Sequence, residues 1–365
     1  MTPLTTPQSD YAYMALALRL AEQGLYTTDP NPRVGCVIVR DGEIVGTGYH
    51  QRAGEPHAEV HALRVAAERA RGADVYVTLE PCNHHGRTPP CSEALIQAGV
   101  ARVIIAASDP HPKASGGEAA LRAAGIGVEQ GMLAAQAEAQ NIGFFARWRR
   151  GRPWVRSKIA MSLDGRTALA SGESQWITGA AARRDVQQWR ARSSALLTGS
   201  GTVLADDPRL TVRELDLGVP VTRLPMRVVV DSAARTPARA AILSAEARTL
   251  MVTAGGRGAW PTHVEHMACA DAAGRVDLNA LMLALARRDV NEVLVEAGAR
   301  LNGALLSAGL IDECIFYIAP ALLGDGARGL FHLPHIATLR DKIALEISDV
   351  RAVGTDWRVT ATPKY

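Results

Sequence analysis

Residues 57–91 read HAEVHALRVAAERARGADVYVTLEPCNHHGRTPPC, and the fold of the first half of the chain is best judged from this stretch. Apolar side chains recur at helical spacing over residues 57–71, which predicts a helix. Residues 74–78 form a short β-branched and aromatic run, which predicts a strand. A loop rich in proline follows, and residues 92–98 predict a second helix. A helix, a strand and a helix in succession are typical of an α/β layer structure.

The segments on either side of this stretch continue the same pattern. Upstream, residues 34–39 and 44–49 predict two strands joined by a hairpin turn at residues 41–42, because Asp-Gly tolerates the positive φ angles of such turns. Downstream, residues 103–107 predict a further strand. The predicted order of strand, strand, helix, strand, helix, strand indicates the α/β fold class.

The chain is long enough for two domains, since 365 residues exceed the size at which one hydrophobic core stops growing. A helix is predicted over residues 133–147, and the basic run RWRRGRPW at residues 147–154 ends it. We place the boundary there, which gives domains 1–150 and 151–365. The second domain is also predicted to be α/β, with a helix at 180–192 and strands at 155–160, 195–198, 227–231, 249–253, 293–296 and 313–318.

The composition indicates an ordinary globular protein, with 47% apolar and 21% charged residues. Forty basic and 37 acidic residues are scattered along the chain, and a net charge of +3 gives no reason to expect nucleic acid. We expect a cytoplasmic protein without a membrane partner, because no signal peptide or long apolar run is present. Five cysteines in such a chain argue for reduced thiols, some of them binding metal, rather than for a disulfide framework.

The strongest chemical signal combines His57 and Glu59 with the later Cys82 and Cys91. One imidazole and two thiolates form a three-ligand zinc site, which leaves a fourth position for a water of lowered pKa. This is the catalytic arrangement rather than the closed structural one. Glu59 lies near the start of the same predicted helix as His57, so its carboxylate is the candidate for moving protons to a departing amino group.

Two alternative interpretations of these residues stay open. The cysteines are nine positions apart, whereas the zinc-deaminase signature separates them by three, so Cys82 and Cys91 could be ordinary buried thiols. His57 would then only begin a helix. Alternatively, His84 or His85 could act as a fourth ligand and close a structural zinc site. The placement of two ligand segments at helix starts favours the catalytic interpretation.

Three strings in the first half resemble one family. NPRVGCVIV, GYHQRAGEPHAEVHAL and TLEPCNHHGRTPPCSEALI are similar to the deaminase domain of the bifunctional riboflavin-biosynthesis deaminase-reductase, in which the longer cysteine spacing is usual. The resemblance implies a cytidine-deaminase-like three-layer α/β/α domain with the zinc ligands and the glutamate named above. It also implies that Asn31 and His50 line the substrate pocket, although His50 could equally be a strand-end histidine without a role.

The resemblance extends over nearly the whole chain. The family's reductase domain, which has a dihydrofolate-reductase-like α/β fold, is similar to the strings KIAMSLDGRTA, SGESQWITG, ARRDVQQWRA, TVLADDPRLTVR, VEAGARLNGALL and YIAPALLGDGARGL. The implied function is hydrolytic deamination of 2,5-diamino-6-(5-phosphoribosylamino)pyrimidin-4-one, followed by NADPH-dependent reduction of the ribosyl group to ribityl. Zn²⁺ and NADPH are the implied cofactors, the partner is a phosphoribosyl-pyrimidine substrate, and family analogy suggests a homo-oligomer.

The second domain lacks the G-x-G-x-x-G fingerprint of a Rossmann cofactor site. Residues 199–202 and Gly298 each follow an apolar strand and could bring backbone amides to a phosphate, although most such junctions are ordinary turns. The resemblance implies a cofactor site lined by Ala160, Ser162, Trp176, Thr202, Asp206, Ser232 and Gly298. It implies substrate contacts from Ser174, Arg190, Leu210, Arg213 and Glu296.

Arg190, Lys158 and Asp206 are polar residues of the second domain for which we consider roles in phosphate binding or catalysis. Arginine suits a phosphate because its planar fork gives two parallel charge-assisted hydrogen bonds, yet on sequence alone Arg190 is read more simply as part of a solvated helix face. Lys158 and Asp206 are our hypotheses for polarising or protonating the sugar during hydride transfer. Asp206 could instead be a structural cap in the ADDP turn.

Two rival functional classes share some of these features. A nucleic-acid deaminase, for example on transfer RNA, or a free-nucleotide deaminase, would use the same zinc chemistry beside an unrelated second domain. A nucleic-acid enzyme should carry a concentrated basic surface and stacking aromatics, whereas this chain has 5% aromatic residues and one basic cluster, RWRRGR. A non-catalytic binding protein with structural zinc would hold metal and show no deamination.

Overall fold

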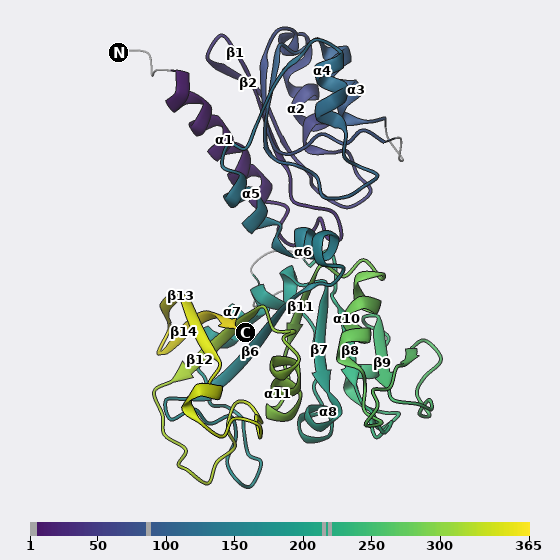
Figure 1. Cartoon of the computed structure of the whole chain (residues 1–365), viewed down its shortest axis with the longest axis vertical. Coiled ribbons are helices and arrows are strands. Elements are labelled where there is room, and N and C mark those ends of the chain that lie inside the picture. Colours follow the sequence, from purple (N-terminus) through teal and green to yellow (C-terminus); the bar gives the residue numbers. More distant parts are fainter. Residues whose placement is uncertain (1–5, 85–88, 214–216, 218–220) are drawn as a thin grey trace. The chain divides into compact units, whose positions relative to one another are not determined.

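The computed structural model describes residues 6–84, 89–213, 217 and 221–365. The chain divides into two compact units, Met1–Arg150 and Gly151–Tyr365, each of which has its own sheet (Figure 1). The division falls within the basic run that ends the helical segment of the first unit. Across the described residues, no helix combines the length and the apolar character needed to cross a membrane.

The first unit is built on a five-stranded sheet in the order β2-β1-β3-β4-β5. Its strands are β1 (Gly35–Arg40), β2 (Glu43–Tyr49), β3 (Asp74–Leu79), β4 (Arg102–Ala107) and β5 (Gly127–Gln130). β1 is antiparallel to both β2 and β3, whereas β3, β4 and β5 are parallel. Asp41 and Gly42 join β1 to β2 with φ angles of 52° and 79°, which confirms the predicted Asp-Gly hairpin turn.

Helices cover both faces of this sheet and give three α/β/α layers (Figure 1). One face carries α2 (Ala58–Ala66), α3 (Cys91–Ala98) and α4 (Gly117–Ala123), and a 3-10 turn, η1 (Ala67–Ala70), follows α2. The other face carries α1 (Thr6–Glu22), α5 (Ala134–Gln140) and α6 (Ile142–Arg150). Alternate residues of β1 enter the two cores, with Cys36 and Ile38 in one and Val37 and Val39 in the other, as the period of a strand requires.

Two glycines of β2 allow α2 to lie unusually close to the sheet. A Cβ added at Gly48 would come within 2.4 Å of the Ala58 carbonyl oxygen, and one at Gly46 within 2.4 Å of the Ala62 carbonyl oxygen. Any side chain at these positions would push the helix away. The position of the start of α2 therefore depends on the absence of side chains in β2.

Two predicted helices differ from those observed. The helix expected over residues 57–71 ends at Ala66, because Ala67 has a φ of 47° and turns the chain. The helix expected over residues 133–147 is divided at Asn141, whose side chain accepts from the backbone N–H of Arg33 at 2.8 Å and donates to its carbonyl oxygen at 2.9 Å. No element was predicted from the sequence for α1, α4 or β5.

The second unit contains a nine-stranded sheet in the order β10-β9-β8-β7-β11-β6-β12-β14-β13. Neighbouring strands from β10 to β12 are parallel, and β14 and β13 extend the sheet in antiparallel fashion. The strands are β6 (Trp154–Ser162), β7 (Ala195–Gly199), β8 (Met226–Val230), β9 (Thr249–Thr253), β10 (Glu265–Ala268), β11 (Glu292–Val295), β12 (Glu313–Ala319), β13 (Ala344–Val353) and β14 (Asp356–Lys364). The six predicted strands are all present, and β10, β13 and β14 are additional.

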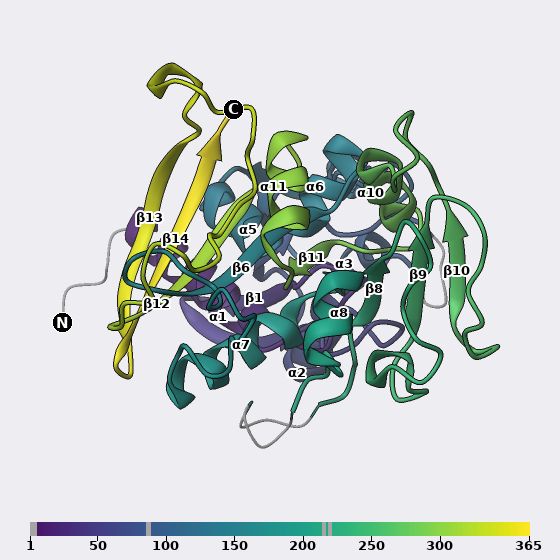
Figure 2. The same cartoon turned by 90° about the horizontal axis from the view of Figure 1, so that it is seen from below.

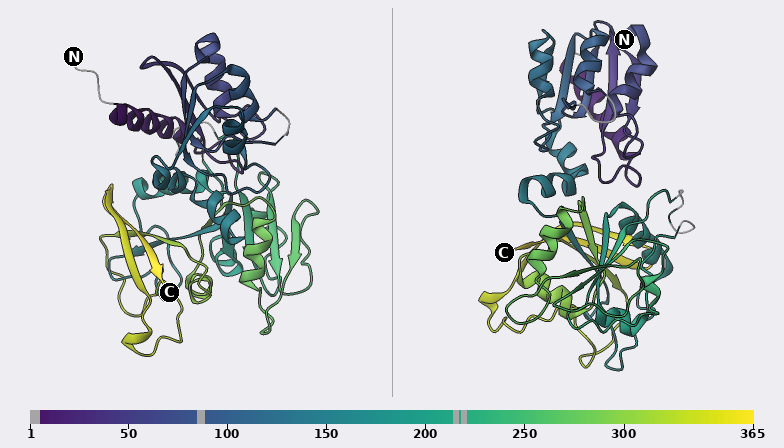
Figure 3. Two further views of the ribbon diagram at one scale, coloured as in Figure 1. Left: turned by 45° about the horizontal axis from the view of Figure 1, so that its top comes forward. Right: turned by 90° about the vertical axis from the view of Figure 1, so that its right-hand side faces the viewer.

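Helices pack on both faces of this sheet as well, so an α/β fold class is confirmed for both units (Figure 2). α10 (Leu278–Ala286) and α11 (Ala299–Ser307) cover one face, and α7 (Ala180–Arg192) and α8 (Ser200–Asp206) cover the other. Short 3-10 turns occur at η2 (Ala241–Leu243) and η3 (Leu339–Asp341). β13 and β14, drawn in yellow, form one edge of the sheet (Figure 3).

The chain order of the parallel strands creates a switch point in this sheet. β7, β8, β9 and β10 step outward to one side, and the chain then returns to insert β11 between β7 and β6. In open α/β sheets, ligands bind outside the carboxyl ends of the strands at such a place. The carboxyl edge at β6, β11 and β7 is therefore where a ligand of the second unit is expected.

Candidate active sites

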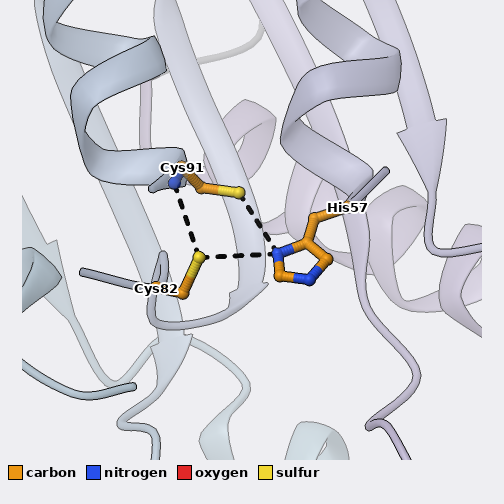
Figure 4. A group of neighbouring side chains, drawn as sticks. All are labelled: His57, Cys82 and Cys91. Carbon is orange, nitrogen blue, oxygen red and sulfur yellow. Dashed lines mark hydrogen bonds between the residues drawn. The ribbon is translucent and has the colours of Figure 1, made fainter. Parts of the chain in front are cut away.

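The predicted metal ligands of the first unit come together in space (Figure 4). His57 directly precedes α2, Cys82 lies in the loop after β3, and Cys91 is the first residue of α3. The His57 Nδ1 atom is 3.5 Å from the Cys82 Sγ atom and 3.3 Å from the Cys91 Sγ atom. The three ligand atoms all lie within 4.8 Å of one another, so one ion would be within reach of each.

The chemistry of this donor set fits zinc. One imidazole nitrogen and two sulfur atoms are typical zinc ligands, and both cysteines are buried. Hydrogen bonds with Cys91 lower the pKa of the Cys82 thiol, which favours the thiolate that binds metal. His84 is exposed and does not belong to the cluster that the described residues form, and His85 lies outside those residues. Within the described residues, the group is therefore the open, three-ligand arrangement.

Glu59 lies in the first turn of α2, two residues after the histidine ligand. Its side chain is only 3% exposed, and its Oε2 atom has no hydrogen-bond partner among the described residues. Burial raises the pKa of Glu59 to about 7, although the nearby His57 acts in the opposite direction. A carboxyl group whose protonated and ionised forms are close in free energy is suited to proton transfer.

A cavity of about 350 Å³ opens beside the metal ligands. Glu59, His57 and Cys82 form part of its wall, together with the predicted pocket residues Asn31 and His50. Its volume lies within the range of small-molecule sites. Five of the six site residues predicted for the first unit therefore line one cavity, and Cys91 is the one that does not.

His50 fixes the orientation of Asn31. The His50 Nδ1 atom is 3.1 Å from the carbonyl oxygen of Pro56, which only accepts hydrogen bonds, so Nδ1 carries the proton. The Nε2 atom of the neutral ring then accepts from Asn31 Nδ2 at 3.1 Å. Burial lowers the pKa of His50 to about 4, which keeps the ring neutral. His50 therefore holds the Asn31 amide with its oxygen turned away from the ring, which favours a role at the pocket over the alternative of a strand-end histidine without a role.

Glu80 is a residue of this site that was not predicted from the sequence. Its buried carboxylate accepts from the backbone N–H groups of Asp109 at 3.2 Å, Gly116 at 2.9 Å and Glu118 at 3.2 Å. These bonds tie the loop before α4 to the end of β3, directly beside Cys82. The available signal was an acidic residue between an apolar strand and Pro-Cys, but the partners of Glu80 lie 29, 36 and 38 residues away in sequence.

In the second unit, the topology places most predicted cofactor residues at the carboxyl edge of the sheet. Ala160 and Ser162 lie at the end of β6, Thr202 follows β7, Ser232 follows β8 and Gly298 follows β11. These strands are neighbours in the order β8-β7-β11-β6. A Cβ at Gly298 would meet no atom within 4 Å, so the backbone there is open to a ligand. The edge offers the backbone and hydroxyl donors that a dinucleotide requires.

Three predicted residues form a buried charged cluster at β6 and β11. Glu296 accepts from Arg190 Nε at 2.5 Å and from Arg190 Nη2 at 3.0 Å, and its Oε2 atom is 2.9 Å from Lys158 Nζ. Burial by itself would raise the pKa of Glu296, but Arg190 and Lys158 together hold it well below its usual range. The interpretation of Arg190 as a residue of a solvated helix face is wrong, since its side chain is 18% exposed and paired.

The remaining predicted residues of the second unit lie outside this cluster. Trp176 is 69% exposed and its ring lies under the Arg183 guanidinium, with Ser174 two residues earlier. Leu210 is buried in the core beneath α7 and α8. Asp206 is the last residue of α8 and is exposed, and the neighbouring Asp207 is the one that accepts from the backbone N–H of Ala241. The backbone N–H of Arg213 donates to Gln187 Oε1 at 3.0 Å.

Known proteins resemble both units of the chain. Residues 7–107 match the family model of the cytidine and deoxycytidylate deaminase zinc-binding region, and residues 153–359 match that of the RibD C-terminal domain. The riboflavin biosynthesis protein RibD of Escherichia coli strain K12 is 53% identical over 359 residues, covering 96% of this chain and 98% of that protein. The RibD protein of Haemophilus influenzae is 48% identical, covering 97% of this chain and 98% of that protein.

Solved structures give the same result. The structure of Acinetobacter baumannii RibD, form 1, superposes with a TM-score of 0.91 and 44% identity, covering 98% of this chain and 99% of that one. A Thermotoga maritima diaminohydroxyphosphoribosylaminopyrimidine deaminase/5-amino-6-(5-phosphoribosylamino)uracil reductase superposes with a TM-score of 0.88 and 32% identity, covering 98% and 99%.

These matches decide between the functional classes that the sequence left open. The similarity runs through both units, so a nucleic-acid or free-nucleotide deaminase with an unrelated second domain is not favoured. The chain is an enzyme, and a non-catalytic zinc protein is likewise not favoured. Its cofactors are zinc and NADPH. The chain belongs to the RibD family of riboflavin biosynthesis proteins, which combine a deaminase with a reductase.

Proposed function

We propose that the first unit deaminates 2,5-diamino-6-(5-phosphoribosylamino)pyrimidin-4-one and that the second unit then reduces the ribosyl group of the product to ribityl. The observation that carries the first step is the His57, Cys82 and Cys91 cluster beside the buried carboxyl of Glu59. The Thermotoga maritima relative is named for both reactions, which supports the substrate assignment. The division of the chain into two units supports one reaction in each.

In the deamination step, zinc when bound supplies an activated water near neutral pH. Glu59 takes a proton at its Oε2 atom and passes it to the amino group that leaves as ammonia. The amino-substituted ring carbon gains an oxygen from water and becomes a carbonyl carbon. Asn31, held by His50, orients the ring through its amide, and the low exposure of Glu59 keeps bulk water away from the proton in transit.

In the reduction step, NADPH when bound supplies a hydride to C1 of the opened ribose. The cluster of Glu296, Lys158 and Arg190 lies at the switch point and would face the sugar there. Because Glu296 stays ionised, it holds Lys158 in place to donate a proton or a hydrogen bond to the sugar oxygen. Arg190, whose Nε and Nη2 atoms donate to Glu296, would contact the substrate as part of this cluster. Arg213 is the proposed phosphate contact, and Asp206 remains a second candidate for the proton donor.

The edge of the second sheet supports a homo-oligomer. Leu345, Ile347 and Val350 of β13 and Trp357 of β14 are between 44% and 61% exposed. A long edge strand with such a row of apolar side chains is uncommon on an isolated protein. We propose that a second copy of the chain covers it, to be measured by light scattering at increasing concentration.

A reducing compartment, the cytoplasm, is the proposed location. All five cysteines are free thiols, and Cys82 and Cys91 bind metal only while they are reduced. An oxidising compartment would place these two neighbouring thiols at risk of forming a disulfide. Fractionation of the source cells would test this directly.

A coupled assay of the purified, zinc-loaded protein tests the proposed function. Ammonia release reports deamination of the diaminopyrimidine ribotide, and the near-ultraviolet absorbance of NADPH reports reduction. We expect ammonia first, and NADPH consumption only after deamination has begun. NADPH loss without ammonia would contradict the proposed order, and ammonia without NADPH loss would contradict the assignment of the second unit.

A further inference from the structure

The carboxyl edge of the second sheet gives a bound dinucleotide a direction. The charged cluster that would face the sugar lies at β6 and β11, which is the nicotinamide end in the proposed function. The sheet order places β7 and then β8 beyond β11. β8 is three strand spacings from β6, about 14 Å away. The adenosine half of the cofactor would therefore lie over β7 and β8.

The loop after β8 carries Arg235 at this adenosine end. Arg235 is exposed, three residues after Ser232, and its Nη2 atom donates to Ser200 Oγ at 3.2 Å. Ser200 begins the segment after β7 that contains Thr202. The guanidinium of Arg235 thus reaches from one predicted cofactor segment to the other.

Hydrogen bonds to Asp231 order the loop that carries Arg235. Asp231 is fully buried, and its Oδ2 atom accepts from the backbone N–H of Thr236 at 2.6 Å. Its backbone carbonyl oxygen accepts from the N–H of Ala234 at 3.0 Å. These two bonds span the position of Arg235 on both sides. The arginine is therefore presented by an ordered turn rather than by a free loop.

The sign of the exposed charge points to a phosphate rather than a hydroxyl. In dinucleotide sites that take NAD, an acidic side chain near a strand end accepts from the ribose 2′-hydroxyl, whereas an arginine accommodates the 2′-phosphate of NADP. Here the acidic residue at the strand end, Asp231, is turned into its own loop. Arg235 pairs with no carboxylate in the described part of the chain.

Two other arginines near this end of the sheet are less suited to binding the phosphate than Arg235. Arg257, which follows β9, donates to the carbonyl oxygens of Pro261 at 3.2 Å and Val264 at 3.3 Å, so its guanidinium stabilises its own loop. Arg239 is exposed in the same loop as Arg235, but no contact within the described residues ties it to the segments that carry Thr202 and Ser232. Of these three arginines, Arg235 is the one bonded to such a segment.

We propose that Arg235 binds the 2′-phosphate of NADPH and is the residue that makes the second unit prefer NADPH to NADH. This inference rests on the proposed placement of the cofactor at the carboxyl edge. The planar guanidinium would give the phosphate two parallel charge-assisted hydrogen bonds, and Ser200 holds it in position. NADH, which has a hydroxyl group at this place, gains no such pair.

The test is the binding of three nucleotides to the full-length, zinc-loaded protein by isothermal titration calorimetry. NADP⁺, NAD⁺ and adenosine 2′,5′-bisphosphate are compared for the wild type and for Arg235→Ala. We expect the variant to bind NADP⁺ and the bisphosphate about 10–100-fold more weakly, the range for a lost charged hydrogen bond. Its affinity for NAD⁺ should change by no more than about two-fold.

Arg239→Ala is the matched control, since it removes an exposed arginine from the same loop. It should leave all three affinities within about two-fold of the wild type. Arg235→Gln, which keeps a donor for Ser200 without the charge, replaces Arg235→Ala if the latter does not fold, as judged by circular dichroism. Either variant should lose the preference for NADP⁺.

The outcomes separate this inference from the proposed function. If the wild type binds neither NADP⁺ nor NAD⁺, the cofactor assignment of the second unit is itself wrong. If the wild type prefers NADP⁺ and both Arg235 variants keep that preference, or if Arg239→Ala loses it, the role of Arg235 is overturned while the proposed function stands.

Discussion

The carboxyl group of Glu59 has a buried oxygen atom without a partner among the described residues, next to three metal-ligating side chains. The variant Glu59→Gln keeps the size and shape of the side chain, but its amide cannot take up and release the proton. We expect deamination to fall by about 10²–10⁴-fold, the usual contribution of a general acid or base, with zinc content unchanged. Ammonia release and metal analysis measure the two effects.

The matched control for that variant is Glu68→Gln, which changes an exposed glutamate just after the same helix. It should leave deamination as in the wild type. If Glu59→Gln also lost its zinc, the loss of activity would report a broken metal site, and the assignment of Glu59 as proton carrier would have no support from the experiment.

The bond between His50 and Asn31 makes a second prediction at the scale of residues. Because His50 orients the Asn31 amide, replacing both residues with alanine should cost little more in KM than replacing either one. A double-mutant cycle on the KM of the diaminopyrimidine ribotide should show a coupling of about 0.5–3 kcal/mol. Effects that simply add would show that the two residues act independently.

The lowered pKa of Glu296 predicts how the stability of the second unit depends on pH. Its folded pKa lies well below the value of about 4.3 in an unfolded chain, because Arg190 and Lys158 stabilise the carboxylate. The carboxylate therefore stabilises the fold above that value, and the contribution decreases as the pH falls below it. Five of the six tryptophans follow residue 150, so tryptophan emission during urea unfolding reports this unit.

For the wild type we expect the urea midpoint to fall between pH 7 and about 3.5. Glu296→Gln should have a lower midpoint at pH 7, because two buried cations lose their partner, and a weaker dependence on pH. A variant that followed the wild type in parallel across this range would contradict the role given to Glu296.

At the scale of elements, the contact between β2 and α2 controls where the metal ligand and the proton carrier sit. Gly48→Ala would place a methyl group 2.4 Å from the Ala58 carbonyl oxygen and push the start of α2 outward. We expect the first unit to lose about 1–3 kcal/mol of stability and deamination to fall further than stability alone explains, since His57 and Glu59 move.

Gly127→Ala provides the comparison, because a methyl group there meets its nearest atom at 3.6 Å, an ordinary contact. It lies in β5 of the same sheet, and deamination and thermal stability should both stay close to the wild type. Equal losses in the two variants would show that the close approach of α2 has no special importance for the site.

Local signals in the sequence predicted the elements well where neighbours in the chain decide the structure. The Asp-Gly turn and the strands beside it were predicted because their φ angles and alternation are local. The helix over residues 133–147 was predicted without its break, because the break comes from a side chain that pairs with Arg33, over a hundred residues away. Glu80 was missed for the same reason.

The candidate sites show the same contrast. The cluster of His57, Cys82 and Cys91 was predicted because one histidine and two cysteines near helix starts are a scarce combination, and this combination is typical of metal binding. The pairing of Glu296 with Lys158 and Arg190 was not predicted, because three residues from three segments meet only through the order of strands in the sheet. Which charges face one another is a property of topology rather than of spacing.

At the scale of the whole molecule, the two units should respond separately to loss of metal. A chelator that removes zinc should reduce ammonia release by at least about 100-fold, since the metal supplies several kcal/mol of transition-state stabilisation. Reduction of 5-amino-6-(5-phosphoribosylamino)uracil by NADPH should be retained, because no ligand of the zinc cluster lies in the second unit. Adding zinc back restores ammonia release.

The converse result is informative as well. If chelation abolished both reactions, the stability of the second unit would depend on the metal site of the first, and the units could not be treated as separate. Thermal unfolding of the chelated protein distinguishes this case, because only a coupled molecule would lose the transition reported by the tryptophans of the second unit.

The insertion of β11 between β6 and β7 affects how the chain folds while it is being synthesised on the ribosome. β7 ends at Gly199 and β11 begins at Glu292, so 93 residues must be synthesised before the gap is filled. At roughly 5–20 residues per second, the nascent chain keeps two apolar strand edges unpaired for about 5–20 s. The zinc cluster, by contrast, needs nothing beyond Cys91. The reductase half is therefore the one that is exposed to misfolding during translation, and chaperones are expected to bind the nascent chain in that interval.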